Sequence, residues 1–181
     1  MLTTPPETSE AVAKFAGHFA LSSDPQRLQV KTRSDSEESD CYVDVAKQIE
    51  EHGGEIVYGW QVWEWPRILI EGEHHAVWKS ENGELMDLSY KADGEEEVVF
   101  IPDPQTPYEG KRIRTLRYPL WNHTLVKKLI KASEAIDAEY ESGQKSETEF
   151  SLNPAIISRL NMEKHRLYQR ICSFPRAKKK A

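Results

Sequence analysis

A run of alternating residues between positions 55 and 65 most constrains what this chain can fold into. Within it, Ile56, Tyr58, Trp60 and Val62 alternate with other residues, and aromatic and β-branched residues are dense through Trp65. Successive side chains of a strand point to opposite faces of a sheet, and aromatic and β-branched residues are common in strands, so the run predicts a β-strand. It ends at Pro66, which has no N–H to donate to a neighbouring strand.

Three further strand candidates follow, at 68–79, 84–90 and 98–101. The Asn82-Gly83 pair lies between the first two of these, and Asn-Gly is a strong hairpin signal. Strands that follow one another along the chain through short turns usually pair antiparallel. The middle of the chain is therefore expected to form an antiparallel β-meander of about four strands.

Helical patterns flank this meander on both sides. A short one covers 11–19, and a second begins at Cys41 and stops at Gly53-Gly54, because glycine readily ends a helix. After the strands, the spacing of apolar residues predicts helices at about 117–142 and 153–172. The expected fold class is α+β, with N-terminal helices, a central antiparallel meander and a C-terminal helical pair.

The length and composition favour one domain. The chain has 181 residues, of which 38% are hydrophobic, and this is enough for one modest core rather than two. We expect a flexible N-terminus at 1–10, a single α+β domain at 11–175 with its core in 41–102, and a basic tail at 176–181.

Charge and apolar patterning limit the expected partners. The formal net charge is -6, so nucleic acid is an unlikely partner except through contacts by Lys178, Lys179 and Lys180 in the basic tail. No stretch stays apolar over the roughly 18 residues that a membrane-spanning helix requires, and the first residues lack the basic start of a secretory signal. A cytoplasmic protein without membrane contact is expected.

The chemistry of interest begins at Cys41. This residue and Cys172 lie far apart without Cys-x-x-Cys spacing, so neither a zinc site nor a disulfide framework is expected, and no cofactor is implied. A helix N-terminus favours the reactive thiolate through its partial positive charge. A nucleophilic cysteine also needs a base and a group that orients the base, and His75 and Asp87 follow downstream.

Three short sequences carry a resemblance to a known superfamily: Cys41-Tyr-Val-Asp-Val45, His75-Ala-Val-Trp78 and Leu85-Met-Asp-Leu-Ser89. The chain resembles the transglutaminase-like branch of the papain-like cysteine hydrolases, including small bacterial or phage proteins. The resemblance implies a sheet of papain or transglutaminase type, with Cys41 as nucleophile, His75 as base and Asp87 as the orienting carboxylate. It also implies a cysteine-dependent hydrolase or acyltransferase that acts on an amide or ester, such as a protease, deamidase or transglutaminase, with a protein or peptide-like substrate.

The hairpin register decides which histidine faces Asp87. A two-residue turn at Asn82-Gly83 pairs position 87 with 78 and places Asp87 on the face of His74. A three-residue loop with Gly83 in the left-handed conformation pairs 87 with 77 and places Asp87 on the face of His75. His74 therefore remains an alternative base.

Several tryptophans surround this region, and Trp60, Trp63 and Trp78 are candidates for a substrate-binding surface. Two other functions remain open. One is a metal site built from Glu73, His74, His75 and Asp87, although adjacent strand residues point apart. The other is a non-catalytic interaction module on the same fold, which becomes the better interpretation if Cys41 is buried and unpaired.

Overall fold

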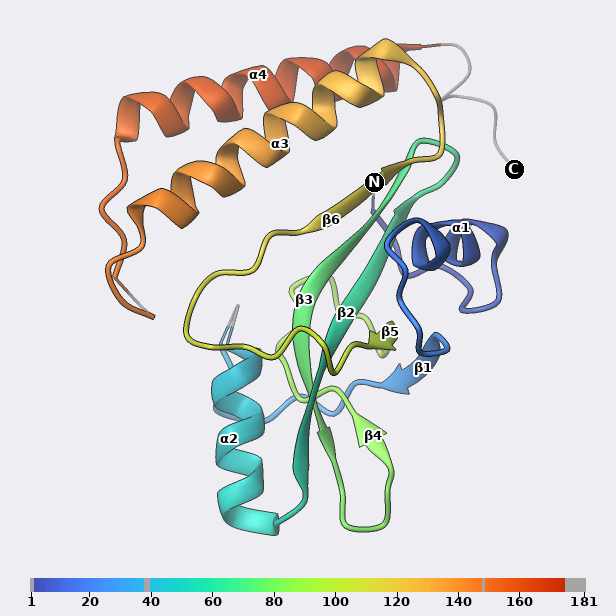
Figure 1. Ribbon diagram of the computed structural model, residues 1–181, viewed down its shortest axis with the longest axis vertical. Coiled ribbons are helices and arrows are strands. Elements are labelled where there is room, and N and C mark those ends of the chain that lie inside the picture. Colours follow the sequence, from blue (N-terminus) through green and yellow to red (C-terminus); the bar gives the residue numbers. More distant parts are fainter. Residues whose placement is uncertain (1, 38–39, 148, 175–181) are drawn as a thin grey trace. The chain divides into compact units, whose positions relative to one another are not determined.

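The strands predicted in the middle of the chain are present in the computed structural model (Figure 1), which describes residues 2–37, 40–147 and 149–174. The sheet consists of β1 (Gln26–Gln29), β2 (Glu55–Trp65), β3 (Leu69–Lys79), β4 (Leu85–Met86), β5 (Glu97–Pro102) and β6 (Leu116–Pro119). The strand order is β1-β5-β2-β3-β4, and β6 pairs with β3. The α+β class and the antiparallel pairing are confirmed, but the sheet has more strands than the sequence predicted.

The described chain falls into two compact units. The first lies within Met1–Glu64 and Gly72–Pro107, and the second within Trp65–Glu71 and Tyr108–Ala181. The sequence does not indicate this division, because both units draw on the same long β2-β3 hairpin.

In the first unit, the sheet curls until its two edges meet. The backbone N–H of Asp87 donates to the carbonyl of Gln29 at 3.1 Å, and the N–H of Lys31 donates to the carbonyl of Asp87 at 2.7 Å. These bonds join the chain after β1 to the chain after β4 through a bridge between Val30 and Asp87. The sheet is thereby nearly closed into a barrel, and Asp87 lies at the closure.

The same bonds explain why the predicted strand at 84–90 is only two residues long. In β4, Leu85 pairs with Lys79 and Met86 pairs with Trp78 of β3. From Asp87 onward, the backbone of this segment forms its hydrogen bonds with the end of β1 and the residues that follow it, and no longer with β3.

The first unit also contains two helices, α1 (Glu10–His18) and α2 (Cys41–His52). The Ser9 hydroxyl caps α1 by accepting from the N–H of Val12 at 3.2 Å. Helix α2 begins at Cys41 and ends at Gly53, whose φ of 70° suits glycine, and both ends are those that the sequence predicted.

The second unit is a helical hairpin with a short strand. Helices α3 (Thr124–Gly143) and α4 (Pro154–Ser173) lie side by side (Figure 1). The prediction of a helix from residue 117 is wrong at its start, because Leu116–Pro119 pairs with β3 as β6 and α3 begins only at Thr124. Helix α4 confirms its predicted start, since the Asn153 side chain accepts from the N–H of Ala155 at 3.1 Å.

No helix in the described part of the chain combines the length and apolar character needed to cross a membrane. The basic tail proposed from the sequence, with Lys178, Lys179 and Lys180, lies outside the described residues.

Candidate functional site

Cys41 is the first residue of α2, where the helix presents N–H groups without intrahelical partners. Asp40 occupies the N-cap position, but no side chain in the described part of the chain makes the capping hydrogen bond. The thiol packs against an apolar cluster that includes Val45, Ala76 and Leu88, and Cys41 is 7% exposed. The first turn of α2 therefore offers a buried thiol beside N–H groups that the Asp40 side chain does not cap.

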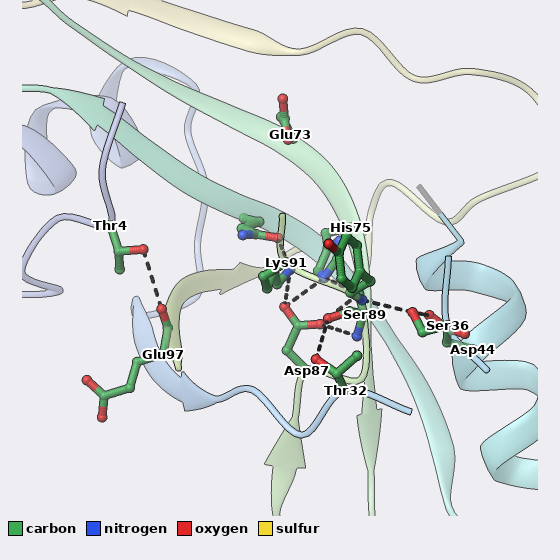
Figure 2. A network of polar contacts seen from close by, with 12 residues as sticks. Thr4, Thr32, Ser36, Asp44, Glu73, His75, Asp87, Ser89, Lys91 and Glu97 are labelled. Atoms are coloured by element: carbon green, nitrogen blue, oxygen red, sulfur yellow. Dashed lines mark hydrogen bonds and ion pairs between the residues drawn. The ribbon is translucent and has the colours of Figure 1, made fainter. Parts of the chain in front are cut away.

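His75 extends from β3 toward the carboxylate of Asp87 (Figure 2). Its Nε2 lies 3.1 Å from Oδ2 of Asp87 and 3.3 Å from Oγ of Ser89. The imidazole is buried, and its ring edge meets Phe100 of β5 at a centroid distance of 6.5 Å. Because Nε2 faces Asp87 and Ser89, Nδ1 is the ring nitrogen left for the thiol of Cys41.

The hairpin register is the reason that His75, rather than His74, faces Asp87. The pairing of Trp78 with Met86 places position 87 opposite 77, which is the register of a three-residue loop. This register excludes the two-residue turn, and Gly83 in the loop has φ of 85°, in the left-handed region.

Asp87 is fully buried, and each of its oxygens has two donors. Oδ1 accepts from the N–H of Ser89 at 2.9 Å and from its hydroxyl at 2.7 Å. Oδ2 faces His75 and also lies 2.6 Å from Nζ of Lys91. Burial alone would raise the pKa of this carboxyl, but His75 and Lys91 outweigh burial and hold the pKa well below its ordinary value.

The charge of Asp87 acts in turn on His75. Burial alone would lower the pKa of the imidazole, but the nearby Asp87 carboxylate and the Cys41 thiol outweigh burial and raise it to about 9. These two neighbours therefore favour the protonated imidazole although it is buried. Burial, followed by an electrostatic interaction with Cys41, raises the pKa of Tyr58, which packs against the same apolar cluster as Cys41.

The segment after β1 holds the backbone around Asp87 in place. Its contacts are the N–H of Arg33 with the carbonyl of Leu88, the hydroxyl of Thr32 with the carbonyl of Ser89, and the N–H of Tyr90 with Oγ of Ser36. The carboxylate is therefore fixed by its backbone as well as by its side-chain partners.

His74 points to the other face of β3. Its Nε2–H donates to the carbonyl of Thr106 at 2.7 Å, and its Nδ1 lies 2.8 Å from the hydroxyl of Tyr42. Burial lowers the pKa of His74 and outweighs the bond to Thr106, so a neutral ring is favoured. The structure thus brings together Cys41, His75 and Asp87, while His74 is bonded elsewhere.

The three tryptophans considered for substrate binding differ in their surroundings. Trp60 and Trp78 are buried, and their indole N–H groups donate to Oδ2 of Asp103 and to the carbonyl of Gly53, each at 2.9 Å. Trp63 is only partly buried, and its N–H donates to Glu73 at 3.3 Å. Trp63 is therefore the member of the three that presents more of its surface.

Three residues of this site were not singled out from the sequence: Ser89, Lys91 and Gln61. A signal for the first two exists, because positions 87, 89 and 91 share a face if the chain there is extended. Gln61 lies on β2 opposite Phe100, the residue that His75 also meets. Nothing in the local sequence distinguishes it from other strand residues.

Two other kinds of site were considered. Within the described residues, no three His, Cys, Asp or Glu side chains are placed to hold a metal ion, so Glu73, His74, His75 and Asp87 do not converge. A hollow of about 320 Å³ is lined by residues such as Arg33, Gln48 and Trp78. It lies toward the C-terminal end of α2, whereas Cys41 is at the other end.

No protein-family model, no curated protein and no solved structure matches this chain. The function must therefore be argued from the geometry of the site.

Proposed function

We propose that the protein is a cysteine-dependent hydrolase or acyltransferase that acts on an amide or ester through Cys41, His75 and Asp87. The observation that carries this proposal is the buried His75, held between the Asp87 carboxylate and the Cys41 thiol with its pKa raised to about 9. An imidazolium in that position stabilises a neighbouring thiolate, which is the nucleophilic form of cysteine.

The geometry supports a two-step reaction. The thiolate of Cys41 attacks the carbonyl carbon, and the oxyanion that forms is stabilised by N–H groups in the first turn of α2. His75 gives its proton to the leaving amine or alcohol as the carbon–heteroatom bond breaks, which leaves an acyl-enzyme. Water or an amine then loses a proton to His75 while it attacks the thioester, and the thiolate is released.

The order of the elements supports placing this site in the transglutaminase-like branch. A helix-borne cysteine, a histidine on a strand and an aspartate after the next strand follow one another along the chain. Asp87 orients the imidazole by accepting from Nε2–H, which is the role of the third member in a triad. Within that branch, peptide cleavage, deamidation and transamidation share the same acyl-enzyme and differ in the acyl donor and acceptor.

The experiment that tests the proposal is the pH dependence of Cys41 alkylation by iodoacetamide, followed by mass spectrometry. Cys172 is an internal control, because it is the other free cysteine and lies on α4 in the second unit. We expect Cys41 to react faster than Cys172 at mildly acidic pH, because its thiolate is stabilised by the His75 imidazolium.

The matched variants are His75→Ala and His74→Ala, which remove neighbouring imidazoles from opposite faces of β3. His75→Ala should slow Cys41 alkylation at pH 6 by about 10-fold or more, the effect of losing an adjacent cation, and His74→Ala should change it much less. The proposed reaction would be ruled out if Cys41 is labelled no faster than Cys172 and its labelling rate is the same in wild type and in His75→Ala.

A further inference from the structure

A buried lysine contacts the same carboxylate oxygen that orients His75. Nζ of Lys91 lies 2.6 Å from Oδ2 of Asp87, and Nε2 of His75 lies 3.1 Å from that oxygen. Figure 2 shows Lys91 and His75 both reaching Asp87. The Lys91 side chain is only 8% exposed, and its second partner is Oε1 of the buried Gln61, at 2.9 Å.

Hydrogen bonding alone does not require a lysine here. Asp87 already accepts two hydrogen bonds from Ser89 and one from His75. Burying an ammonium group is costly, whereas a neutral donor would complete the same set of hydrogen bonds at a smaller desolvation cost. What Lys91 adds is a positive charge.

That charge acts within a small set of titratable groups. The groups around His75 are Asp87 and Lys91 from the segment after β4, Cys41 from α2, and His74, its neighbour on β3. Gln61 is neutral, and the amide nitrogen of its side chain has no hydrogen-bond partner within the described residues. Lys91 is therefore the only lysine or arginine in this set.

Resting on the proposed function, we propose that Lys91 is a positioning residue that fixes the Asp87 carboxylate and offsets part of its charge, so that His75 can still release its proton during the reaction. An unopposed buried carboxylate would hold the imidazolium more strongly. His75 must give a proton to the leaving group and later take one from the attacking water or amine. Lys91 thus keeps the pKa of His75 closer to neutral pH than Asp87 alone would.

The size of the effect follows from the geometry. Because both groups contact one oxygen, Nζ of Lys91 and Nε2 of His75 lie within about 6 Å of each other, and loss of the ammonium charge should raise the pKa of His75 by about one to two pH units. A lysine that serves only to fill space would leave this pKa unchanged when a side chain of similar length replaces it.

The test is an NMR titration of His75 in protein with carbon-13-labelled histidine. Lys91→Met retains the length and removes the charge, and Lys91→Gln removes the charge but keeps a donor for Asp87. Lys79→Met is the matched control, because Lys79 lies on β3 in the same unit and forms a surface ion pair with Glu55 of β2. If Lys91→Met does not fold, Lys91→Gln carries the test.

A higher His75 pKa in both Lys91 variants, with Lys79→Met equal to wild type, supports the inference. An unchanged His75 pKa, even with lower thermal stability, would overturn it, and so would a change in Lys91→Met alone. This readout is independent of thiol reactivity. If Cys41 alkylation is slow and its rate is the same in His75→Ala, the proposed function is rejected. If the His75 pKa is the same with and without Lys91, only the role of Lys91 is rejected.

Discussion

Replacing Asp87 by Asn should destabilise the first unit strongly, and more at pH 6 than at pH 10. The carboxylate is the counter-charge of two buried cations, His75 and Lys91. Asparagine keeps an acceptor for Ser89, but its neutral amide leaves both cations without a counter-charge. Removing one partner of a buried pair typically costs about 3–5 kcal/mol, and we expect a loss of this size at pH 6.

The pH dependence follows from the direction of the His75 shift. The pKa of His75 is raised from 6.5 to about 9 in the folded protein, so its contribution to stability is complete below 6.5 and is lost as the pH rises through 9. A rise of this size corresponds to roughly 3 kcal/mol. The cost of Asp87→Asn should therefore fall by up to roughly 3 kcal/mol between pH 6 and pH 10.

The assay is guanidinium unfolding followed by tryptophan fluorescence at both pH values. Asp103→Asn is the matched control, because this carboxylate accepts from the neutral donors Trp60 and Thr106 and forms no ion pair with any lysine or arginine among the described residues. We expect the control to cost about 1–3 kcal/mol with little change between the two pH values. An Asp87→Asn variant that costs no more than the control, or costs the same at both pH values, would refute the reasoning.

Two further predictions concern packing and ion pairs. Gly59→Ala should cost about 1–3 kcal/mol in thermal or chemical unfolding, because the added Cβ would lie 2.2 Å from a carbonyl oxygen of β5. Gly17→Ala on α1 meets nothing within 4 Å and should be neutral or stabilising, so equal effects would contradict this view. Arg117→Met should destabilise the second unit by about 3 kcal/mol, because it removes the guanidinium 2.5 Å from the buried Asp137, which keeps a longer contact with Arg112 at 3.4 Å. Arg114→Met, which breaks an exposed pair, should cost less than about 1 kcal/mol, and comparable losses in the two variants would argue against the buried pair.

Local sequence signals were sufficient for the long elements of the fold. The alternation from Ile56 to Val62 and the dense aromatic residues through Trp65 identify β2, and the paired glycines at 53 and 54 end α2. Strands β1 and β6 have four residues each, and they are held by partners distant in sequence. A segment that short has too little periodicity to identify, because its conformation is determined by long-range pairing.

The candidate site was predictable in its residues but not in its geometry. Position in the sequence indicated Cys41, His75 and Asp87, but the choice between His75 and His74 depended on one residue of loop length. Both loops are compatible with Asn-Gly and place Gly83 at positive φ, so only the register of β3 and β4 distinguishes them. Lys91 was missed because its role depends on Asp87 being buried, which results from the closure of the sheet.

The central claim is that His75 is a buried imidazolium held between Asp87 and Cys41, and its titration by NMR in wild type and in Cys41→Ala tests this most directly. The account predicts a pKa near 9 in wild type and a lower value in the variant, because the thiol contributes to the shift. A His75 that titrates near its ordinary value of 6.5 in both proteins would contradict the account.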